Sequence, residues 1–388
     1  MRIAPPHHCF ALHRRLIAGL LGTALWAVLA PALADAVPLK DAPFKVEEIA
    51  RFEEPWASAV LPDGRLLVTE LPGKIFIVDT KGKRMGPLAG LPGVDVGGQG
   101  GLGDVVLHPD FAANKTIYLS YAEAGNEPGS ENVRGAAVAR ARLEFTSSGA
   151  QIEGLEVIWR QVPKRPGRGH FGHRLAFDGQ GFLYITSGER QAFTPAQDMA
   201  QNLGKVIRLH DDGSVPQDNP FAAQGGVAAE VWTLGHRNPL GIAFDAAGTL
   251  WVHEMGPRGG DELNRIVRGA NYGYPLVSNG DHYNGDDIPD HSTRPDLAAP
   301  ALSWNPAISP AGFVIYRGDK FRNWQGSGLI GGLSSKALIR VTFDGTSAQE
   351  AERFLMGRRI REIEEGQSGD LWLLEDGRRG RLLRLTPR

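Results

Sequence analysis

Cysteine is almost absent from this chain. Cys9 is the single cysteine among 388 residues, and it lies within residues 1–34, which we predict to be a cleaved signal peptide. The mature protein then contains neither a disulfide nor a free thiol, which excludes a disulfide scaffold. Its stability must come from the apolar core, helped by any bound ions.

Long hydrophobic runs are also missing outside the N-terminal segment. Arg14 and Arg15 precede an apolar stretch over residues 16–29, and an Ala-Leu-Ala sequence at 32–34 has the small residues of a cleavage site. This stretch is shorter than the roughly 20 residues of a membrane-spanning helix, so an uncleaved anchor is the less favoured alternative. We therefore expect export by the Sec or twin-arginine route, a periplasmic or secreted protein, and no membrane insertion after cleavage.

The chain has no large excess of charge of either sign. Its formal charge is −2, and loss of Arg2, Arg14 and Arg15 with the signal peptide makes it −5. A mildly acidic surface argues against nucleic acid or an anionic membrane as a partner.

Several familiar catalytic and nucleotide-binding motifs are missing too. The glycine-rich stretch at residues 97–103 has neither the Lys-Ser/Thr of a phosphate-binding loop nor dinucleotide-binding spacing. No His/Cys array has zinc-like spacing, and no Gly-x-Ser-x-Gly sequence marks a serine hydrolase. The glycines around Gln99 instead allow the backbone to approach a flat ligand closely.

What the chain has in abundance is turns. Its 50 glycines and 26 prolines favour many short strands. A turn with Asp or Gly followed by two short apolar strands recurs six times. The predicted strand pairs are 66–68 with 75–78, 117–119 with 136–143, 182–185 with 206–209, 250–252 with 264–267, 329–331 with 337–341, and 371–374 with 381–385.

Six such units predict an all-β, six-bladed propeller formed by residues 35–388 as a single domain. A pair of β-sandwiches is the alternative. Residues 46–49 are placed to supply a closing strand to the last blade. The long inserts at 187–205 and 268–312 are expected at the face of the ring where loops build a site.

Three segments carry side chains suited to chemistry. Arg237 carries a planar, permanently charged guanidinium group, and Asn238 beside it carries an amide that can both donate and accept hydrogen bonds. A surface turn with a structural arginine is an equal alternative. Residues 254–262 combine glycines with carboxylates, which are oxygen donors that Ca²⁺ prefers. The default interpretation of this segment is a solvated acidic turn. His170 precedes a strand and Glu189 follows it, so the carboxylate can orient the imidazole as a general base.

Together these segments resemble the soluble quinoprotein glucose/sorbosone dehydrogenase family, and within it the aldose sugar dehydrogenase branch. The resemblance covers nearly the whole chain after the signal peptide. The matching strings are Glu-Pro-Trp at 54–56, Gly-Gln-Gly-Gly-Leu at 98–102, His-Phe-Gly at 170–172, Asp-Asn-Pro-Phe at 218–221, Arg-Asn-Pro at 237–239, Gly-Pro-Arg-Gly-Gly-Asp-Glu at 256–262, Asn-Tyr-Gly-Tyr-Pro at 271–275 and Arg-Ile-Arg at 359–361.

The resemblance implies a six-bladed propeller that oxidises aldoses at C1 to the lactone with pyrroloquinoline quinone (PQQ) and Ca²⁺. His170 matches the base that takes the anomeric hydroxyl proton while hydride passes to the quinone, and Glu189 matches the carboxylate behind it. The residues implied to contact the quinone are Gln99, Arg237, Asn238, Tyr283, Arg359 and Arg361. Carbonyl oxygens of Gly256 and Pro257 are implied to hold the catalytic Ca²⁺, and Glu262 and Tyr272 a second, structural Ca²⁺.

The chain departs from the family pattern at two places. His173 stands where relatives have glycine, which predicts a narrowed pocket or competition with His170 for Glu189. Ser334 replaces a lysine that binds the cofactor in relatives. Lys336 is expected to take its place, because residues two apart in a strand share a face.

Two other functions compete with the dehydrogenase. A calcium-dependent propeller lactonase shares the fold and the metal, and a non-catalytic propeller would bind a sugar or a protein. Neither needs three arginines around a tri-anion, so Arg237, Arg359 and Arg361 favour the dehydrogenase. An external quinone or cytochrome is expected to accept the electrons.

Overall fold

The computed structural model describes residues 34–147 and 149–388. The predicted signal peptide lies outside the described residues except for Ala34. The chain divides into two units, Met1–Ala32 and Leu33–Arg388, and the fold described here belongs to the second.

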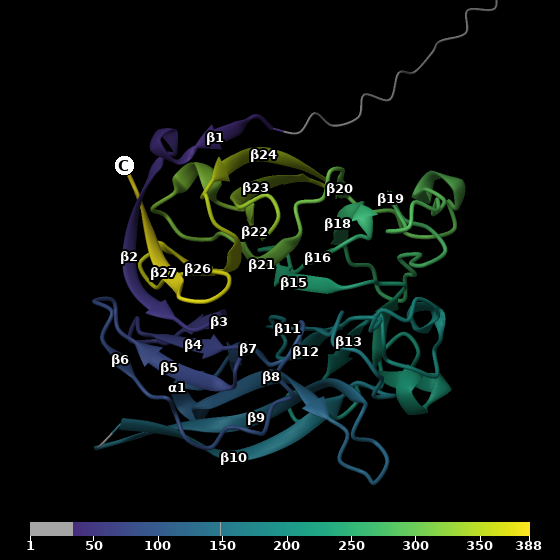
Figure 1. Ribbon diagram of the computed structural model, residues 1–388, viewed down its shortest axis with the longest axis horizontal. Coiled ribbons are helices and arrows are strands. Elements are labelled where there is room, and N and C mark those ends of the chain that lie inside the picture. The colour runs from purple at the N-terminus through teal and green to yellow at the C-terminus, as the bar shows by residue number, and fades with distance from the viewer. Residues whose placement is uncertain (1–33, 148) are drawn as a thin grey trace, which may run out of the picture. The chain divides into compact units, whose positions relative to one another are not determined.

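Five four-stranded sheets and one five-stranded sheet follow one another around a ring in the described residues, as in a six-bladed β-propeller (Figure 1). The all-β, six-bladed prediction is therefore confirmed. The strands of the first three blades are, from the inside outward, β3 (Pro55–Val60), β4 (Leu66–Glu70), β5 (Lys74–Val78) and β6 (Arg84–Met85); β7 (Leu102–Leu107), β8 (Thr116–Ala124), β9 (Arg134–Thr146) and β10 (Gly149–Arg160); β11 (Gly172–Phe177), β12 (Leu183–Ser187), β13 (Lys205–Leu209) and β14 (Val231–Leu234).

The other three blades have the same order. Their strands are β15 (Pro239–Phe244), β16 (Leu250–Glu254), β18 (Asp261–Arg265) and β20 (Leu302–Trp304); β21 (Pro310–Ile315), β22 (Gly328–Gly332), β23 (Ala337–Asp344) and β24 (Ser347–Leu355); β25 (Ile360–Glu365), β26 (Leu371–Glu375), β27 (Gly380–Pro387) and β2 (Phe44–Phe52). The short helices are η1 (Leu39–Asp41), α1 (Phe111–Asn114), η2 (Thr194–Gln197), η3 (Ala222–Gln224), η4 (Gly226–Glu230), η5 (His291–Thr293) and η6 (Arg322–Trp324).

The ring is closed by a strand from the start of the fold. β2 pairs antiparallel with β27 from Phe44 opposite Pro387 to Phe52 opposite Gly380, so the last blade takes its outermost strand from the N-terminal side. This confirms the closing strand predicted at residues 46–49. β1 (Ala36–Pro38) adds to the outer edge of the fifth blade, parallel to β24.

In the fourth blade, a turn with aspartate and glycine sets where the second strand begins. Asp245 Oδ1 accepts hydrogen bonds from the backbone N–H groups of Ala247 and Thr249, and Gly248 takes φ 82°. An aspartate that bonds backbone two residues on, followed by a glycine with positive φ, is a self-contained turn. The apolar strand β16 follows directly.

Apolar side chains from neighbouring blades fill the space between the sheets. Leu67 and Ile75 of the first blade share one buried cluster with Leu119 and Ala139 of the second. A single blade would leave this face in water, so the burial requires the ring.

One predicted strand was misplaced. The fourth unit's second strand was expected at residues 264–267, but β18 runs over Asp261–Arg265, with Glu254 opposite Glu262. Ile266 and Val267 follow its end, because a two-residue apolar signal does not fix the register of a buried strand.

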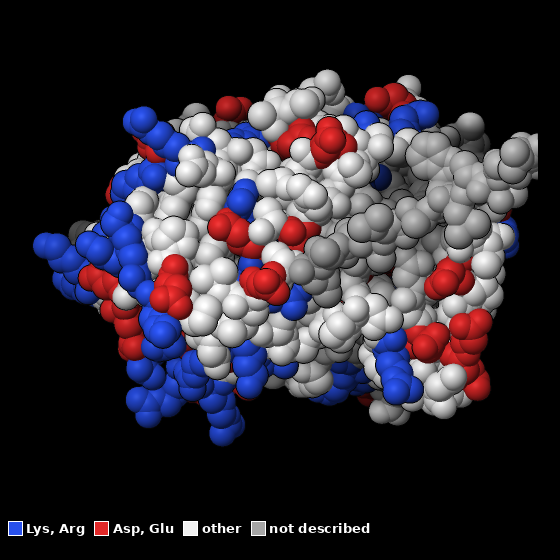
Figure 2. All heavy atoms as spheres, turned by 90° about the horizontal axis from the view of Figure 1, so that it is seen from above, with Lys and Arg blue, Asp and Glu red and all other residues white. Residues whose placement is uncertain are grey.

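The described residues carry no helix with the length and hydropathy needed to cross a membrane. On the face drawn in Figure 2, basic side chains gather at the left margin with acidic ones beside them. Surface ion pairs, such as the one between Arg51 and Glu48, connect basic side chains with acidic ones.

Candidate active site

The propeller topology gathers the candidate residues at one end of the ring. Gln99, His170 and Asn238 each precede an innermost strand by one to three residues, whereas Glu189 and Asp376 each follow the end of a second strand. In an antiparallel pair the start of one strand lies beside the end of the next. Residues remote in sequence therefore meet at the same edge of all six blades.

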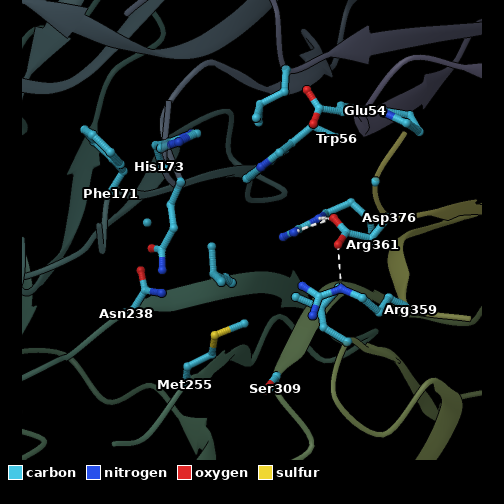
Figure 3. A pocket seen from close by; sticks show the side chains of 18 residues that line it. Glu54, Trp56, Phe171, His173, Asn238, Met255, Ser309, Arg359, Arg361 and Asp376 are labelled. Atoms are coloured by element: carbon cyan, nitrogen blue, oxygen red, sulfur yellow. Dashed lines mark hydrogen bonds and ion pairs between the residues drawn. The ribbon is translucent and has the colours of Figure 1, made fainter. Parts of the chain in front are cut away.

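Two neighbouring cavities open among these residues. We call the first, of about 360 Å³, the arginine cavity; its lining includes Trp56, Gln99, His173, Asn238, Arg359 and Arg361 (Figure 3). We call the second, of about 380 Å³, the histidine cavity; its lining includes His170, Glu189, Phe193, Arg237, Pro257 and Tyr283. Adjacent residues such as Arg237 and Asn238 line one cavity each, so the two lie side by side.

His170 and Glu189 form the pair expected of a base and its orienting carboxylate. His170 Nδ1 lies 2.5 Å from Glu189 Oε1, and both side chains are buried. Burial lowers the pKa of His170, and the positive charge of Arg237 adds to this, against the opposite effect of Glu189. A neutral imidazole that donates from Nδ1 keeps its lone pair on Nε2, where it can accept a proton.

Glu189 is held ionised by several donors. Its Oε2 accepts hydrogen bonds from the backbone N–H groups of Ala192 and Phe193, the latter at 2.6 Å. Burial works against its charge, but the hydrogen bond with His170 and these backbone groups outweigh burial and lower its pKa. A charged Glu189 therefore fixes the tautomer of His170.

The loop before β11 is also tied to Gln99. The backbone N–H of His170 donates to Gln99 Oε1 at 2.7 Å, and His170 has φ 47°. A positive φ is unusual for histidine and indicates that neighbouring contacts impose the conformation. Gln99 thus joins the wall of the arginine cavity to the backbone of the candidate base.

Two arginines and an aspartate lie together on one wall of the arginine cavity. Figure 3 shows Arg359 and Arg361 both directed at Asp376, with Asn238 and His173 opposite. Asp376 accepts from Arg359 Nε at 2.6 Å and from Arg361 Nη2 at 2.6 Å. Burial opposes the charge on Asp376, but Arg361 and Arg359 outweigh it and lower its pKa. Glu54 also lines the cavity, so its charged side chains are two guanidinium groups and two carboxylates, and Arg359 and Arg361 are the groups able to bind an anionic ligand.

Polar atoms without partners lie between the two cavities. Asn238 Oδ1 and Arg237 Nε are buried and make no hydrogen bond among the described residues. Buried polar atoms are costly unless a ligand or water completes them. Together with the arginines, they suit a flat ligand that carries several carboxylates and carbonyls, so the residues present fit PQQ.

The backbone expected to hold the catalytic Ca²⁺ lies beside Arg237. The Gly256 carbonyl accepts a hydrogen bond from Arg237 Nη1 at 2.6 Å, and Pro257 lines the histidine cavity. No group of three or more His, Cys, Asp or Glu side chains within residues 34–147 and 149–388 is arranged to hold a metal. The donors near Gly256 are carbonyl oxygens and the Asp261 carboxylate, which accepts the Gly256 N–H at 2.9 Å, and oxygen donors suit Ca²⁺ rather than a transition metal.

Glu262 and Tyr272 belong to a buried polar cluster. Glu262 Oε1 lies 3.1 Å from His291 Nε2, and Glu262 Oε2 accepts from Asn264 Nδ2 at 3.2 Å. Tyr272 stacks on His236, with ring centroids 4.8 Å apart. Burial raises the pKa of Glu262.

The structure overturns two premises about the departures from the family pattern, namely that His173 pairs with Glu189 and that Lys336 lies in a strand. His173 does not compete for Glu189, because its Nδ1 lies 2.8 Å from Ser120 Oγ and its ring stacks on Trp56 at 5.1 Å. Its ring does line the arginine cavity. Lys336 does not continue a strand: β22 ends at Gly332 and β23 starts at Ala337, so Lys336 lies in an exposed turn and lines neither cavity.

Three residues without a role predicted from sequence also lie in the site. Trp56 and Asp376 line the arginine cavity, and Phe193 lines the histidine cavity. Trp56 had a signal, since it belongs to the Glu-Pro-Trp string. Asp376 had none, because an aspartate after a strand is ordinarily a turn residue.

Comparisons with known proteins agree with this arrangement. The family model described as Glucose / Sorbosone dehydrogenase matches residues 52–384. Aldose sugar dehydrogenase YliI of Escherichia coli K12 is 39% identical over 376 residues, covering 95% of this chain and 96% of that protein.

Solved structures show the same similarity. The apo-form of the soluble aldose sugar dehydrogenase from Escherichia coli superposes with a TM-score of 0.82 at 38% identity, covering 89% of this chain and 100% of that one. The PQQ-bound aldose sugar dehydrogenase of Streptomyces coelicolor superposes with a TM-score of 0.73 at 28% identity, covering 92% and 100%. The chain therefore belongs to the glucose/sorbosone dehydrogenase family, which confirms both the resemblance and the prediction of an oxidoreductase.

Proposed function

We propose that this protein is a PQQ- and Ca²⁺-dependent aldose dehydrogenase that oxidises the anomeric carbon of a sugar to the lactone. One observation carries the proposal: the His170–Glu189 pair adjoins a cavity that is lined by Arg359 and Arg361 and bordered by unpartnered buried polar atoms. The PQQ-bound state of a relative of the same fold supports the choice of cofactor.

The reaction removes a proton from the anomeric hydroxyl and a hydride from C1, which leaves the lactone. His170 Nε2 accepts the proton, because Nδ1 is engaged with Glu189. Glu189 stabilises the imidazolium that forms. When bound, PQQ together with Ca²⁺ supplies the acceptor for the two electrons, with Ca²⁺ as a Lewis acid.

The residues assigned to the cofactor divide between the two cavities. Gln99, Asn238, Arg359 and Arg361 would hold it from the arginine cavity. Arg237 and Tyr283 would hold it from the histidine cavity, where Arg237 Nη2 lies 3.5 Å from the Tyr283 hydroxyl.

The calcium assignments are part of the same proposal. Carbonyl oxygens of Gly256 and Pro257 would bind the catalytic Ca²⁺, after Arg237 Nη1 leaves the Gly256 carbonyl or shares it. Glu262 and the Tyr272 carbonyl would bind a second, structural Ca²⁺. The signal peptide proposed for residues 1–34 would place the enzyme in the periplasm or outside the cell, where an external quinone or cytochrome reoxidises it.

The test is reconstitution. Purified protein is incubated with PQQ and CaCl₂, and reduction of an electron-accepting dye is followed with a panel of aldoses. Dye reduction that requires PQQ, Ca²⁺ and an aldose is the expected result. Hydrolysis of lactones without dye reduction would overturn the proposal in favour of a lactonase.

A further inference from the structure

The histidine cavity has an aromatic wall that includes Phe193, a residue without a role in the proposed reaction. The Phe193 ring lies 6.3 Å from the Tyr274 ring at an interplanar angle of 27°, and 5.7 Å from the His282 ring. Phe193 is 44% exposed and Tyr283 is 74% exposed. Large aromatic side chains exposed in a cavity beside a candidate base are typical of a binding surface.

Phe193 is held in a backbone conformation that side chains rarely adopt. Its φ and ψ are 63° and −82°, and the Thr194 N–H donates to the Ala192 carbonyl at 2.9 Å. This is a γ-turn with a positive φ at its centre, the rarer and more strained form. Strain of this kind persists where surrounding contacts impose it, and it concentrates at ligand-binding positions.

The contact that imposes the turn comes from the catalytic pair. Glu189 Oε2 accepts the Phe193 N–H at 2.6 Å, while Glu189 Oε1 lies 2.5 Å from His170 Nδ1. One carboxylate therefore fixes both the candidate base and the aromatic ring beside it. The His170 imidazole and the Phe193 backbone therefore keep a fixed position relative to each other, because both bond the Glu189 carboxylate.

We propose that Phe193 determines substrate specificity by stacking on the ring of a pyranose whose anomeric carbon lies at His170. This inference rests on the proposed function. A pyranose with equatorial hydroxyl groups presents an apolar C–H face and a polar rim, which matches an aromatic face beside polar side chains. Gln191, Asn284 and Asp286 line the same cavity and supply those polar partners.

The substrate class follows from that match. Pyranose aldoses with equatorial hydroxyls, as in the β-gluco configuration, bring a continuous C–H face to Phe193. Open-chain aldoses and polyols have no such face. The aromatic wall therefore selects ring-form sugars, while His170 selects those with a free anomeric hydroxyl.

The test compares Phe193→Ala, Phe193→Leu and Phe193→Tyr with the matched control Phe145→Ala. Phe145 is also an exposed aromatic residue, at 43%, but it lies outside both cavities and under the guanidinium of Arg65. All replacements keep Cβ, so the backbone strain at Phe193 is unchanged. KM and kcat are measured with D-glucose, and saturation-transfer NMR is measured with methyl β-D-glucoside, whose anomeric oxygen is blocked.

We expect Phe193→Ala and Phe193→Leu to raise KM roughly 5- to 50-fold with kcat within about threefold of wild type. Saturation transfer to the ring C–H protons is lost in both, and is retained in Phe193→Tyr and Phe145→Ala. Wild-type KM and wild-type saturation transfer in a folded Phe193→Leu protein would overturn the inference. The NMR measurement needs no turnover, so wild-type protein that oxidises no aldose defeats the proposed function alone, while saturation transfer still decides whether Phe193 contacts the sugar.

Discussion

Glu189 bonds two different parts of the site, with Oε1 2.5 Å from His170 Nδ1 and Oε2 2.6 Å from the Phe193 nitrogen. The imidazole is thereby presented to the histidine cavity with Nε2 free. This places the proton-accepting atom on a rigid support just before the start of the innermost strand β11, where reorientation costs free energy and preorganisation favours reaction.

Replacing His170 removes the proposed base. We expect His170→Ala to lower kcat by roughly 10²- to 10⁴-fold, the usual contribution of a positioned base. PQQ affinity should change little, because the arginines remain. Dye-reduction kinetics and a cofactor titration measure the two effects, with His210→Gln, an exposed histidine outside both cavities, as the control. Undiminished turnover in loaded His170→Ala protein would remove His170 from the mechanism.

The pH dependence of the reaction follows from the burial of His170. Burial lowers its pKa, so the base stays neutral at pH 7 and kcat/KM falls only as pH drops below the ordinary histidine range near 6.5. Glu189 acts in the opposite direction by raising that pKa. Glu189→Gln should therefore move the acidic limb of the profile to lower pH and reduce the plateau. An acidic limb that moves upward in this variant would contradict the assigned pairing.

Replacing Arg361 tests whether the arginine cavity binds the cofactor. Arg361→Gln leaves Asp376 paired only with Arg359 and removes a charge from the lining, so the Kd for PQQ should rise by about 10-fold or more. Arg358→Gln is the matched control. It makes the same change of charge three residues away, where the arginine pairs with Glu375 and does not line the cavity. Equal effects of the two variants would indicate a general electrostatic attraction instead of a specific contact.

Two buried histidines make the fold sensitive to acid. Burial lowers the pKa of His173 and of His253 to about 3. Between that value and about 6.5 the unfolded chain binds protons that the folded chain does not, so the free energy of unfolding falls as pH falls. Each histidine contributes about 1.4 kcal/mol per pH unit inside this window. Denaturant titrations from pH 4 to 6 should show a shallower slope for His173→Phe than for wild type, and identical slopes would show that His173 is protonated in the folded state.

The strands that the sequence revealed are those in the middle of each blade. β16 and β26 are buried on both faces and read as short apolar runs after a turn. The innermost strands carry polar side chains toward the centre of the ring, such as Arg174 in β11, which pairs with Glu362 of β25. The outer strands have an exposed side. Both kinds lack a continuous apolar signal, so they were not predicted, except for the outermost closing strand at residues 46–49.

The site was predicted where one short motif contains the chemistry. His170, Arg237 and Asn238 stand in recognisable strings, and Glu189 was found because one strand separates it from His170. The stack of His173 on Trp56 joins the first and third blades and depends on ring closure, so no local pattern reveals it. The left-handed turn at Phe193 also has no sequence signal, because glycine is the residue that such a conformation predicts.

The most direct test of the account is a titration of purified wild-type protein with PQQ, followed by absorbance or calorimetry, with Ca²⁺ and with a calcium chelator. We predict saturable uptake of one PQQ per chain with Ca²⁺, and affinity at least about 10-fold weaker after chelation, because Ca²⁺ would add two positive charges to that of Arg237 beside the anionic quinone. Absence of PQQ uptake at saturating cofactor and Ca²⁺ would contradict the central claim that these two cavities bind a quinone beside His170.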